Sequence, residues 1–197
     1  MAIATSYIRA FLEKWETRQL VGYIPCNPKN YISGPTDGYK PIGASGVTIG
    51  TGLDLGQQTR LDLIRMGVSE NLIDKFRPYL GKRTFNALHA LEASPLRITD
   101  DECEELDTAV HGEYILRAER KFNACSSLIF SEIPKEAQVA IVSMVYQLGS
   151  PGSKISGVWR LICGGNWKTA GSSLIADKSR YRLRRIDEGK LLSQIGV

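Results

Sequence analysis

The stretch Ser45-Gly-Val-Thr-Ile-Gly-Thr-Gly-Leu-Asp-Leu-Gly-Gln57 interrupts a sequence that is otherwise mostly helical in pattern. Its β-branched residues favour a short strand, and its glycines favour a sharp bend in that strand. It closes a longer segment, Gly22 to Gly56, which contains eight of the 19 glycines and four of the eight prolines. We therefore expect a small β-region at about residues 22–56.

The residues on both sides of this segment have helical periodicity. Apolar residues at positions 8, 11, 12 and 15 have the i, i+3, i+4, i+7 spacing of one helix face, which predicts a helix over 3–20. After the β-region, the pattern predicts further helices at 57–66, 69–79, 82–93, 99–122, 134–148, 156–163, 166–177 and 180–194.

The length of 197 residues suits one domain, and no internal repeat is present. We expect a single α+β domain, mainly α, over 1–197. Its β-rich lobe would lie at about 22–56 and its helical lobe at about 57–197 together with the first helix. A cleft between these two lobes is the expected place for a functional site.

The composition is 43% hydrophobic and 23% charged, which indicates a globular chain and excludes a disordered or fibrous one. No stretch approaches the ~18 apolar residues that a membrane span requires, so we expect no integral membrane segment. The N-terminal residues lack the basic start, apolar run and cleavage site of a signal peptide. We expect synthesis in the cytoplasm without such a peptide.

The net charge is +4, from 25 Lys and Arg against 21 Asp and Glu, and the pI is near 8.9. Much of this excess lies between Lys178 and Lys190, and two interpretations remain open. The segment could attract an anionic partner such as nucleic acid, a membrane surface or an acidic wall polymer. Equally, it could be a solvated helix face on which Arg184 pairs with Glu188 one turn later.

The cysteines do not form a metal-binding pattern. None lies in a C-x-x-C pair, and the two histidines are not spaced with them as zinc ligands would be. The sequence selects none of the three possible pairings, and free, mostly buried thiols are the expected state. The residues concerned are Cys26, Cys103, Cys125, Cys163, His89 and His111.

Two carboxylates at the edges of the β-region are candidates for acid–base chemistry. Glu16 lies roughly 90° from the centre of the apolar helix stripe, whereas Glu13 lies roughly 150° away on the solvent side. Glu16 is therefore expected to be half-buried, and partial desolvation favours the protonated form that a general acid needs. The alternative is a surface glutamate at a helix end.

Asp54 also has two compatible interpretations. It precedes an apolar-periodic run and is typical of a helix N-cap, with Gln57 as a reciprocal partner. An aspartate fixed in this way is also a well-positioned base, and a Glu and an Asp on separate elements suit glycoside hydrolysis. Asp37 is a reserve candidate for the second carboxylate. No phosphate-binding or dinucleotide motif occurs, and both histidines lie in helical patterns, which argues against a nucleophilic triad.

Five motifs, taken together, resemble one family. They are Glu16-x5-Gly22-Tyr23-Ile24-Pro25, the 45–57 stretch, Gln138-Val-Ala-Ile-Val-Ser-Met-Val-Tyr-Gln-Leu-Gly-Ser150, Gly164-Gly-Asn-Trp-Lys-Thr-Ala170 and Arg184-Arg-Ile-Asp-Glu188. Their order and type are similar to those of the pesticin-type muramidases, which are relatives of the phage-type lysozymes. The order of Thr48 before Asp54 matches the pesticin branch. The resemblance implies a lysozyme-like fold.

The resemblance also implies an activity and its residues. Glu16 would be the general acid, Asp54 the catalytic aspartate, and Thr48 a holder of the nucleophilic water. The reaction would be hydrolysis of the β-1,4 bond between N-acetylmuramic acid and N-acetylglucosamine in peptidoglycan, with inversion and with no metal or cofactor. Substrate contacts would come from Tyr23 and Tyr146 as sugar-stacking platforms and from Gln147.

The resemblance leaves rivals and partners open. A lytic transglycosylase needs one acid–base glutamate and no water-holding aspartate, and a wall-binding domain needs neither. A nucleic-acid binder would depend on Arg180 to Arg185, without any recognised reading motif, so no nucleic acid is expected. The protein would act in the periplasm or wall of a target bacterium as a phage endolysin, injected effector or bacteriocin domain. An immunity protein could then plug its cleft, and residues 26–44 could form a lid, a specificity loop or an inhibitor contact.

Overall fold

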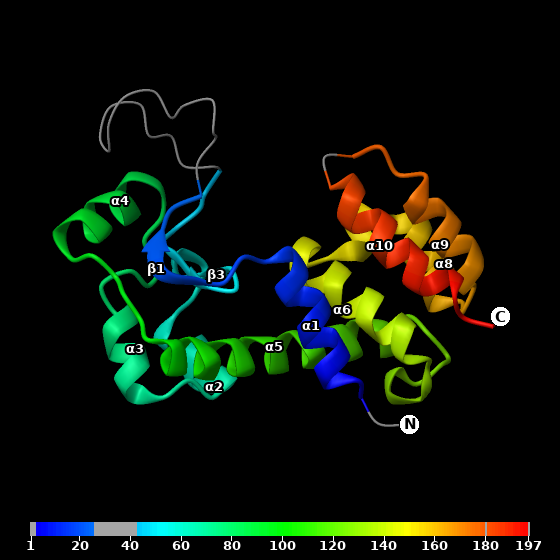
Figure 1. Ribbon diagram of the computed structural model, residues 1–197, viewed down its shortest axis with the longest axis horizontal. Helices are drawn as coiled ribbons and strands as arrows, with labels where there is room; N and C mark the ends of the chain where they lie inside the picture. Colours follow the sequence, from blue (N-terminus) through cyan, green and yellow to red (C-terminus); the bar gives the residue numbers. More distant parts are fainter. Residues whose placement is uncertain (1–2, 26–42, 180, 197) are drawn as a thin grey trace. The chain divides into compact units, whose positions relative to one another are not determined.

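The computed structural model describes residues 3–25, 43–179 and 181–196. It is mainly helical with one small antiparallel sheet, which confirms the α+β expectation (Figure 1). No helix in the described part of the chain is long and apolar enough to cross a membrane. The elements are α1 (Thr5–Trp15), β1 (Gln19–Tyr23), β2 (Thr48–Gly50), β3 (Leu53–Asp54), η2 (Leu55–Gln57), α2 (Arg60–Met66), α3 (Glu70–Phe76), α4 (Thr84–Ala93), α5 (Asp100–Asn123), η3 (Phe130–Glu132), α6 (Lys135–Leu148), α7 (Pro151–Lys154), α8 (Ser156–Cys163), α9 (Trp167–Ile175) and α10 (Arg182–Ser193).

The described residues form two compact units. One unit spans Glu16–Val110 and contains the sheet with α2, α3, α4 and the first half of α5. The other contains α1 and the chain from His111 onward, including the second half of α5. The β-region therefore shares its unit with three short helices.

The sheet begins earlier than the sequence predicted. A helix was expected through residue 20, but α1 ends at Trp15 and β1 starts at Gln19. The cause is tertiary pairing: the Leu20 carbonyl accepts a hydrogen bond from the Ile98 amide at 3.0 Å, and the Gly22 amide donates to the Leu96 carbonyl at 3.0 Å. Hydrogen bonds with residues 96–98, which are distant in the sequence, therefore outweigh the local helical propensity of these residues.

The helices after the sheet follow the predicted pattern closely. Thr99 and Glu102 form a capping box at the start of α5, with the Thr99 amide 2.9 Å from the Glu102 carboxylate and the Glu102 amide 3.2 Å from the Thr99 hydroxyl. Pro134 directly precedes α6, as its missing amide allows. Helix α6 is the centre of its unit, since every residue from Ala137 to Val145 is buried.

Helix α6 is covered by apolar side chains from five other helices. These come from α1, the second half of α5, α8, α9 and α10, and Figure 1 shows α8, α9 and α10 lying beside one another. Burying such side chains is the main source of stability for a domain of this size. The most buried contributors are Ile8, Leu12, Ala118, Phe122, Ile162, Ala170, Leu174 and Leu192.

The structure corrects the expectation of free thiols. Cys125 and Cys163 form a disulfide, with 5.7 Å between their Cα atoms, which links the end of α5 to the end of α8. The sequence could not reveal this bond because the two residues are 38 positions apart and their separation in space depends on helix packing. Cys103 is a buried free thiol, and Cys26 lies outside the described residues.

The structure also corrects one interpretation of the basic segment near the C-terminus. Arg184, Arg185 and Glu188 on α10 are 4%, 2% and 0% exposed, so the motif is not a solvated helix face. The Arg184–Glu188 contact exists, at 3.6 Å, but inside the unit. Arg185 pairs with the same carboxylate at 2.5 Å. The apolar pattern of α10 is weak, and these charged side chains are among its buried residues. Each of them requires a partner in the protein because an unpaired buried charge is costly.

Candidate active site

Glu16 lies directly after α1, and its residue is half-buried, as the helical wheel predicted. Leu12, one turn earlier, is fully buried and fixes which face of the helix points inward. The chain bends at Glu16 and enters β1 three residues later. The glutamate therefore belongs to the same compact unit as the sheet.

The sheet register brings Tyr23, Thr48 and Asp54 into one row. In this antiparallel sheet, Thr48 on the central strand β2 lies opposite Tyr23 on β1 and opposite Asp54 on β3. Residues that lie directly opposite each other project their side chains from the same face of a sheet. Thr48 is 4% exposed, whereas Tyr23 is 38% exposed. The three predicted residues therefore form one side-chain row with an accessible end.

Tyr23 links this row to Glu16. Burial raises the pKa of the Tyr23 phenol, and the negative charges of Glu16 and Asp54 raise it further. Both carboxylates must lie within electrostatic range of one phenol for this effect to occur. Two candidate carboxylates that are 38 positions apart in sequence thus act on the same phenol, and both favour its neutral, protonated form.

Two glycine amides hold Asp54 in place. Its Oδ1 atom accepts hydrogen bonds from the Gly46 amide at 3.0 Å and from the Gly56 amide at 2.9 Å. The second bond makes Asp54 the N-cap of η2, which confirms the predicted cap. Both glycines are required for close approach, because a Cβ atom at Gly46 would lie 2.5 Å from the Gly56 Cα atom. Gln57 donates to the Ala44 carbonyl at 2.9 Å.

The pKa of Asp54 is raised above its ordinary value, and burial is the main cause. The amides of Gly46 and Gly56 act in the opposite direction, as does the positive charge of Arg83. The carboxylate is therefore more basic than an exposed aspartate while its orientation is fixed. These are the properties of a group that positions or deprotonates a water molecule.

Asp107 holds the β2–β3 turn by hydrogen bonds, a contact that the sequence interpretation missed. Its Oδ1 atom accepts hydrogen bonds from the Thr51 amide at 3.0 Å and the Thr51 hydroxyl at 2.7 Å. Thr51 forms the turn of the β2–β3 hairpin beside Gly50, whose φ of +62° favours glycine. Asp107 is 2% exposed on the buried face of α5, one turn from Cys103. An acidic residue within an apolar helix stripe was the available sequence signal.

Two predicted substrate-binding residues do not belong to the compact unit that contains this row. Tyr146 and Gln147 lie in the other compact unit, near the end of α6. The Tyr146 ring packs on that of Tyr114, with 4.4 Å between centroids, and the Gln147 side-chain oxygen accepts a hydrogen bond from Arg185. Their roles in substrate binding stay predictions. Asp37 lies outside the described residues, as does most of the 26–44 segment.

The side chains in and beside this row are of the types that carry out acid–base chemistry. Among the described residues, no group of three or more His, Cys, Asp and Glu side chains could hold a metal ion. A half-buried glutamate, a neutral phenol, a buried threonine hydroxyl and a fixed aspartate are available within one unit. Such a set can donate a proton at one point and orient water at another.

The fold and this row define a lysozyme-like protein. A solved crystal structure of a P22 lysozyme mutant matches the chain with a TM-score of 0.54 and 16% sequence identity, and the match covers 98% of both chains. A family model described as "Pesticin: Bacterial toxin homologue of phage lysozyme, C-term" matches residues 9–168. The chain therefore belongs to the pesticin family of phage-lysozyme homologues. The search of curated proteins finds no match.

Proposed function

We propose that this protein is a peptidoglycan muramidase, which hydrolyses the β-1,4 bond between N-acetylmuramic acid and N-acetylglucosamine. The observation that carries the proposal is the arrangement around Tyr23. This phenol lies opposite Thr48 in the sheet and within electrostatic range of both Glu16 and Asp54. Membership of a family described as homologous to phage lysozyme supports the substrate class.

In the proposed mechanism, Glu16 transfers its proton to the glycosidic oxygen as the C1–O bond breaks. A water molecule attacks C1 from the opposite face of the sugar, and Asp54 accepts its proton. The Thr48 hydroxyl lies 3.5 Å from the Gly46 carbonyl oxygen and orients this water together with Asp54. Attack from the opposite face inverts the anomeric carbon, for which the two carboxyl groups must be about 6.5–9.5 Å apart.

Tyr23 has a supporting role in this mechanism. The raised pKa of Tyr23 keeps its phenol protonated, so the hydroxyl can donate a hydrogen bond to a sugar oxygen. Its exposed ring surface can also stack on a sugar face. Because the phenol stays neutral, it adds no negative charge near Asp54 that would disfavour the ionised carboxylate.

The decisive experiment is digestion of purified peptidoglycan, followed by mass spectrometry of the fragments. The native protein should produce reducing N-acetylmuramic acid ends, and Glu16→Gln should abolish them because the amide carries no transferable proton. The matched control is Glu13→Gln, which alters an exposed glutamate near the end of α1, the helix that precedes Glu16. Glu13 pairs with Arg9 at 2.8 Å, and this variant should retain full activity.

Each of the other outcomes would point to a different class of protein or a different role for Glu16. Anhydro-muramic acid ends would show a lytic transglycosylase, which uses the glutamate without a water-holding aspartate. Binding to peptidoglycan without cleavage by the folded native protein would indicate a wall-binding domain. Equal activity of Glu16→Gln and native protein would remove Glu16 from the mechanism.

The biological role proposed with this activity is antibacterial. The family model describes a bacterial toxin homologue, so we place the site of action in the periplasm or wall of a target bacterium. A phage endolysin released through a holin, an injected effector and a bacteriocin domain each deliver such an enzyme. A toxin of this kind requires an immunity protein in its producer, and the simplest inhibitor would cover Glu16 and Asp54. Co-expression of candidate inhibitors with the native protein, assayed by peptidoglycan release, tests this.

A further inference from the structure

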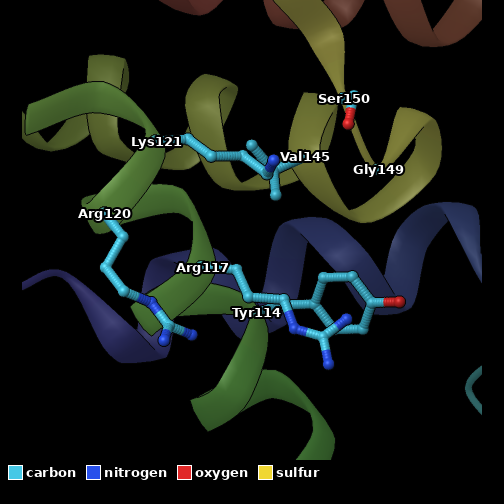
Figure 2. Close-up of a pocket in the computed structure, with 7 residues that line it drawn as sticks. All are labelled: Tyr114, Arg117, Arg120, Lys121, Val145, Gly149 and Ser150. Atoms are coloured by element: carbon cyan, nitrogen blue, oxygen red, sulfur yellow. The ribbon is translucent and has the colours of Figure 1, made fainter. Parts of the chain in front are cut away.

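A basic pocket lies between α5 and the end of α6, within the unit that contains the chain from His111 onward. Its volume is about 420 Å³ (Figure 2). Typical small-molecule sites measure about 300–1,000 Å³, whereas one water molecule occupies about 30 Å³ in the liquid. The pocket is therefore large enough for an organic ligand and much larger than a single ion. Its lining residues are Tyr114, Arg117, Arg120, Lys121, Val145, Gly149 and Ser150.

The charge in this pocket is unbalanced. Arg117, Arg120 and Lys121 share one face of α5 through their spacing of three and four residues. Glu113 pairs with Arg117 at 2.7 Å and with Arg120 at 3.3 Å. Among the residues that the structure describes, Lys121 has no ion pair. Three cations face one carboxylate, which leaves an excess of two positive charges.

One wall of the pocket is held rigid. The Arg117 guanidinium lies 5.1 Å from the centroid of the Tyr114 ring, and that ring packs in turn on Tyr146. Figure 2 shows Arg117 in front of the Tyr114 ring and Lys121 reaching from α5 toward Val145. A guanidinium fixed by a carboxylate and a ring loses little conformational freedom when it binds an anion.

The position of these cations has a simpler partial explanation. Basic side chains in the last turns of a helix interact favourably with its negative end, and Arg120 and Lys121 lie in the last turn of α5. That effect explains why the side chains at positions 120 and 121 are positively charged. It does not explain the cavity, its aromatic wall or the presence of Arg117, which lies further from the helix end. Gly149 and Ser150 close the opposite side, where the serine offers a hydroxyl to a polar ligand.

We infer that this pocket binds the carboxylate-bearing peptide of a peptidoglycan fragment, separately from Glu16 and the row of Tyr23, Thr48 and Asp54. The inference rests on the proposed function for its choice of substrate. A peptide-substituted disaccharide carries free carboxylates for the cations, amides for Ser150 and apolar side chains for the partly exposed Tyr114 ring. A lone anion would leave most of the 420 Å³ unfilled.

The test is a titration of Glu16→Gln protein, which prevents turnover, with a disaccharide-tetrapeptide probe. A second probe has the same structure with every carboxyl amidated, and inorganic phosphate is the third. Binding is located by the amide NMR shifts of Gly149 and Ser150, and affinity is measured by calorimetry. When Lys121→Gln is introduced into the Glu16→Gln protein, the acidic probe should bind about fivefold to tenfold more weakly, because one charge-assisted contact is lost. The control is Lys168→Gln in the same Glu16→Gln protein. It removes an exposed lysine that does not line this pocket and should leave the affinity for the acidic probe unchanged.

The expected result is that the acidic probe shifts both amides and binds more tightly than the amidated probe, in a salt-sensitive manner. Equal binding of both probes, or unmoved Gly149 and Ser150 amides, would overturn the inference. Phosphate binding as tight as that of the acidic probe would also overturn it, since the site would then be a general anion site. If the native protein cleaves peptidoglycan but the probe leaves the Gly149 and Ser150 amide signals unmoved, only the inference about this pocket is rejected. If the probe binds at the pocket but the native protein does not cleave peptidoglycan, only the proposed function is rejected.

Discussion

Asp54 and Glu188 are two carboxylates whose pKa is raised by burial, yet their surroundings differ. Asp54 is half-buried, and two backbone amides bind one of its oxygens. Glu188 is completely buried; it accepts a hydrogen bond from the Ser143 hydroxyl at 2.6 Å and contacts two arginines. Burial raises the pKa of Glu188 to about 7.

The difference shows that a shifted pKa alone does not identify a catalytic group. Glu188 has the larger shift, but its neighbours use both of its oxygens and leave no route for a substrate. Asp54 has the smaller shift, but it lies in a row with Thr48 and the partly exposed Tyr23. The accessible carboxylate of the two therefore lies in the sheet, whereas the carboxylate on α10 is enclosed by its own hydrogen-bond and ion-pair partners.

The largest expected effect is that of Asp54→Asn on turnover. The amide oxygen of asparagine can still accept hydrogen bonds from Gly46 and Gly56, so the hairpin should fold. It cannot accept a proton from water, and kcat on peptidoglycan should fall by about 10²- to 10⁴-fold. Thermal unfolding of the variant is the control and should change by less than about 1 kcal/mol. Unchanged kcat with lost stability would make Asp54 only a helix cap.

The second expected effect is on stability, from Arg185→Met. Glu188 has a folded-state pKa of about 7, above its ordinary value, so its stability contribution is complete below that ordinary value and is lost as pH rises through about 7. The positive charge of Arg185 lowers this pKa, and its removal raises it further. The variant should therefore lose about 3–5 kcal/mol near pH 8, where the carboxylate is left without that partner, and much less near pH 5.

Denaturant unfolding at both pH values measures this difference. The control is Lys190→Met, which removes an exposed lysine from the same helix and should show no comparable pH dependence. A loss for Arg185→Met that is equal at both pH values would show that packing of the long side chain, rather than charge compensation, explains its burial.

The sequence predicted the local parts of this molecule and missed the long-range ones. The 45–57 stretch predicted the hairpin and the cap at Asp54, because glycines and β-branched residues act within a few positions. Helix periodicity predicted α2 to α6 within a few residues of their ends. Neither could predict that Leu20 pairs with Ile98, that Asp107 holds the hairpin turn, or that Cys125 meets Cys163. Each of these contacts joins segments that are far apart in the sequence.

The third expected effect concerns that missed contact between Thr51 and Asp107. Thr51→Val keeps the side-chain shape and the backbone amide but removes the hydroxyl that donates to Asp107. The loss should be about 1 kcal/mol in the free energy of unfolding. Because the hairpin carries Thr48 and Asp54, kcat should fall about threefold to tenfold while KM stays unchanged. Thr108→Val alters an exposed threonine beside Asp107 and is the control. A changed KM with constant kcat would mean that the turn affects substrate binding instead.

The smallest expected effect separates the charge around Asp54 from its hydrogen bonds. Arg83 lowers the pKa of Asp54 by its positive charge, and its Nε atom donates to the Gly56 carbonyl at 3.0 Å. Arg83→Gln removes the charge, so the pKa of Asp54 rises and the acid limb of kcat/KM should move upward by a few tenths of a pH unit. Arg83→Lys keeps the charge without the planar fork and should leave the limb in place. The shift should shrink in high salt because Arg83 is exposed. The opposite result is an acid limb that stays fixed in Arg83→Gln but moves in Arg83→Lys. It would show that Arg83 acts through its hydrogen bond to the Gly56 carbonyl rather than through its charge. The basicity of Asp54 would then depend on backbone geometry alone.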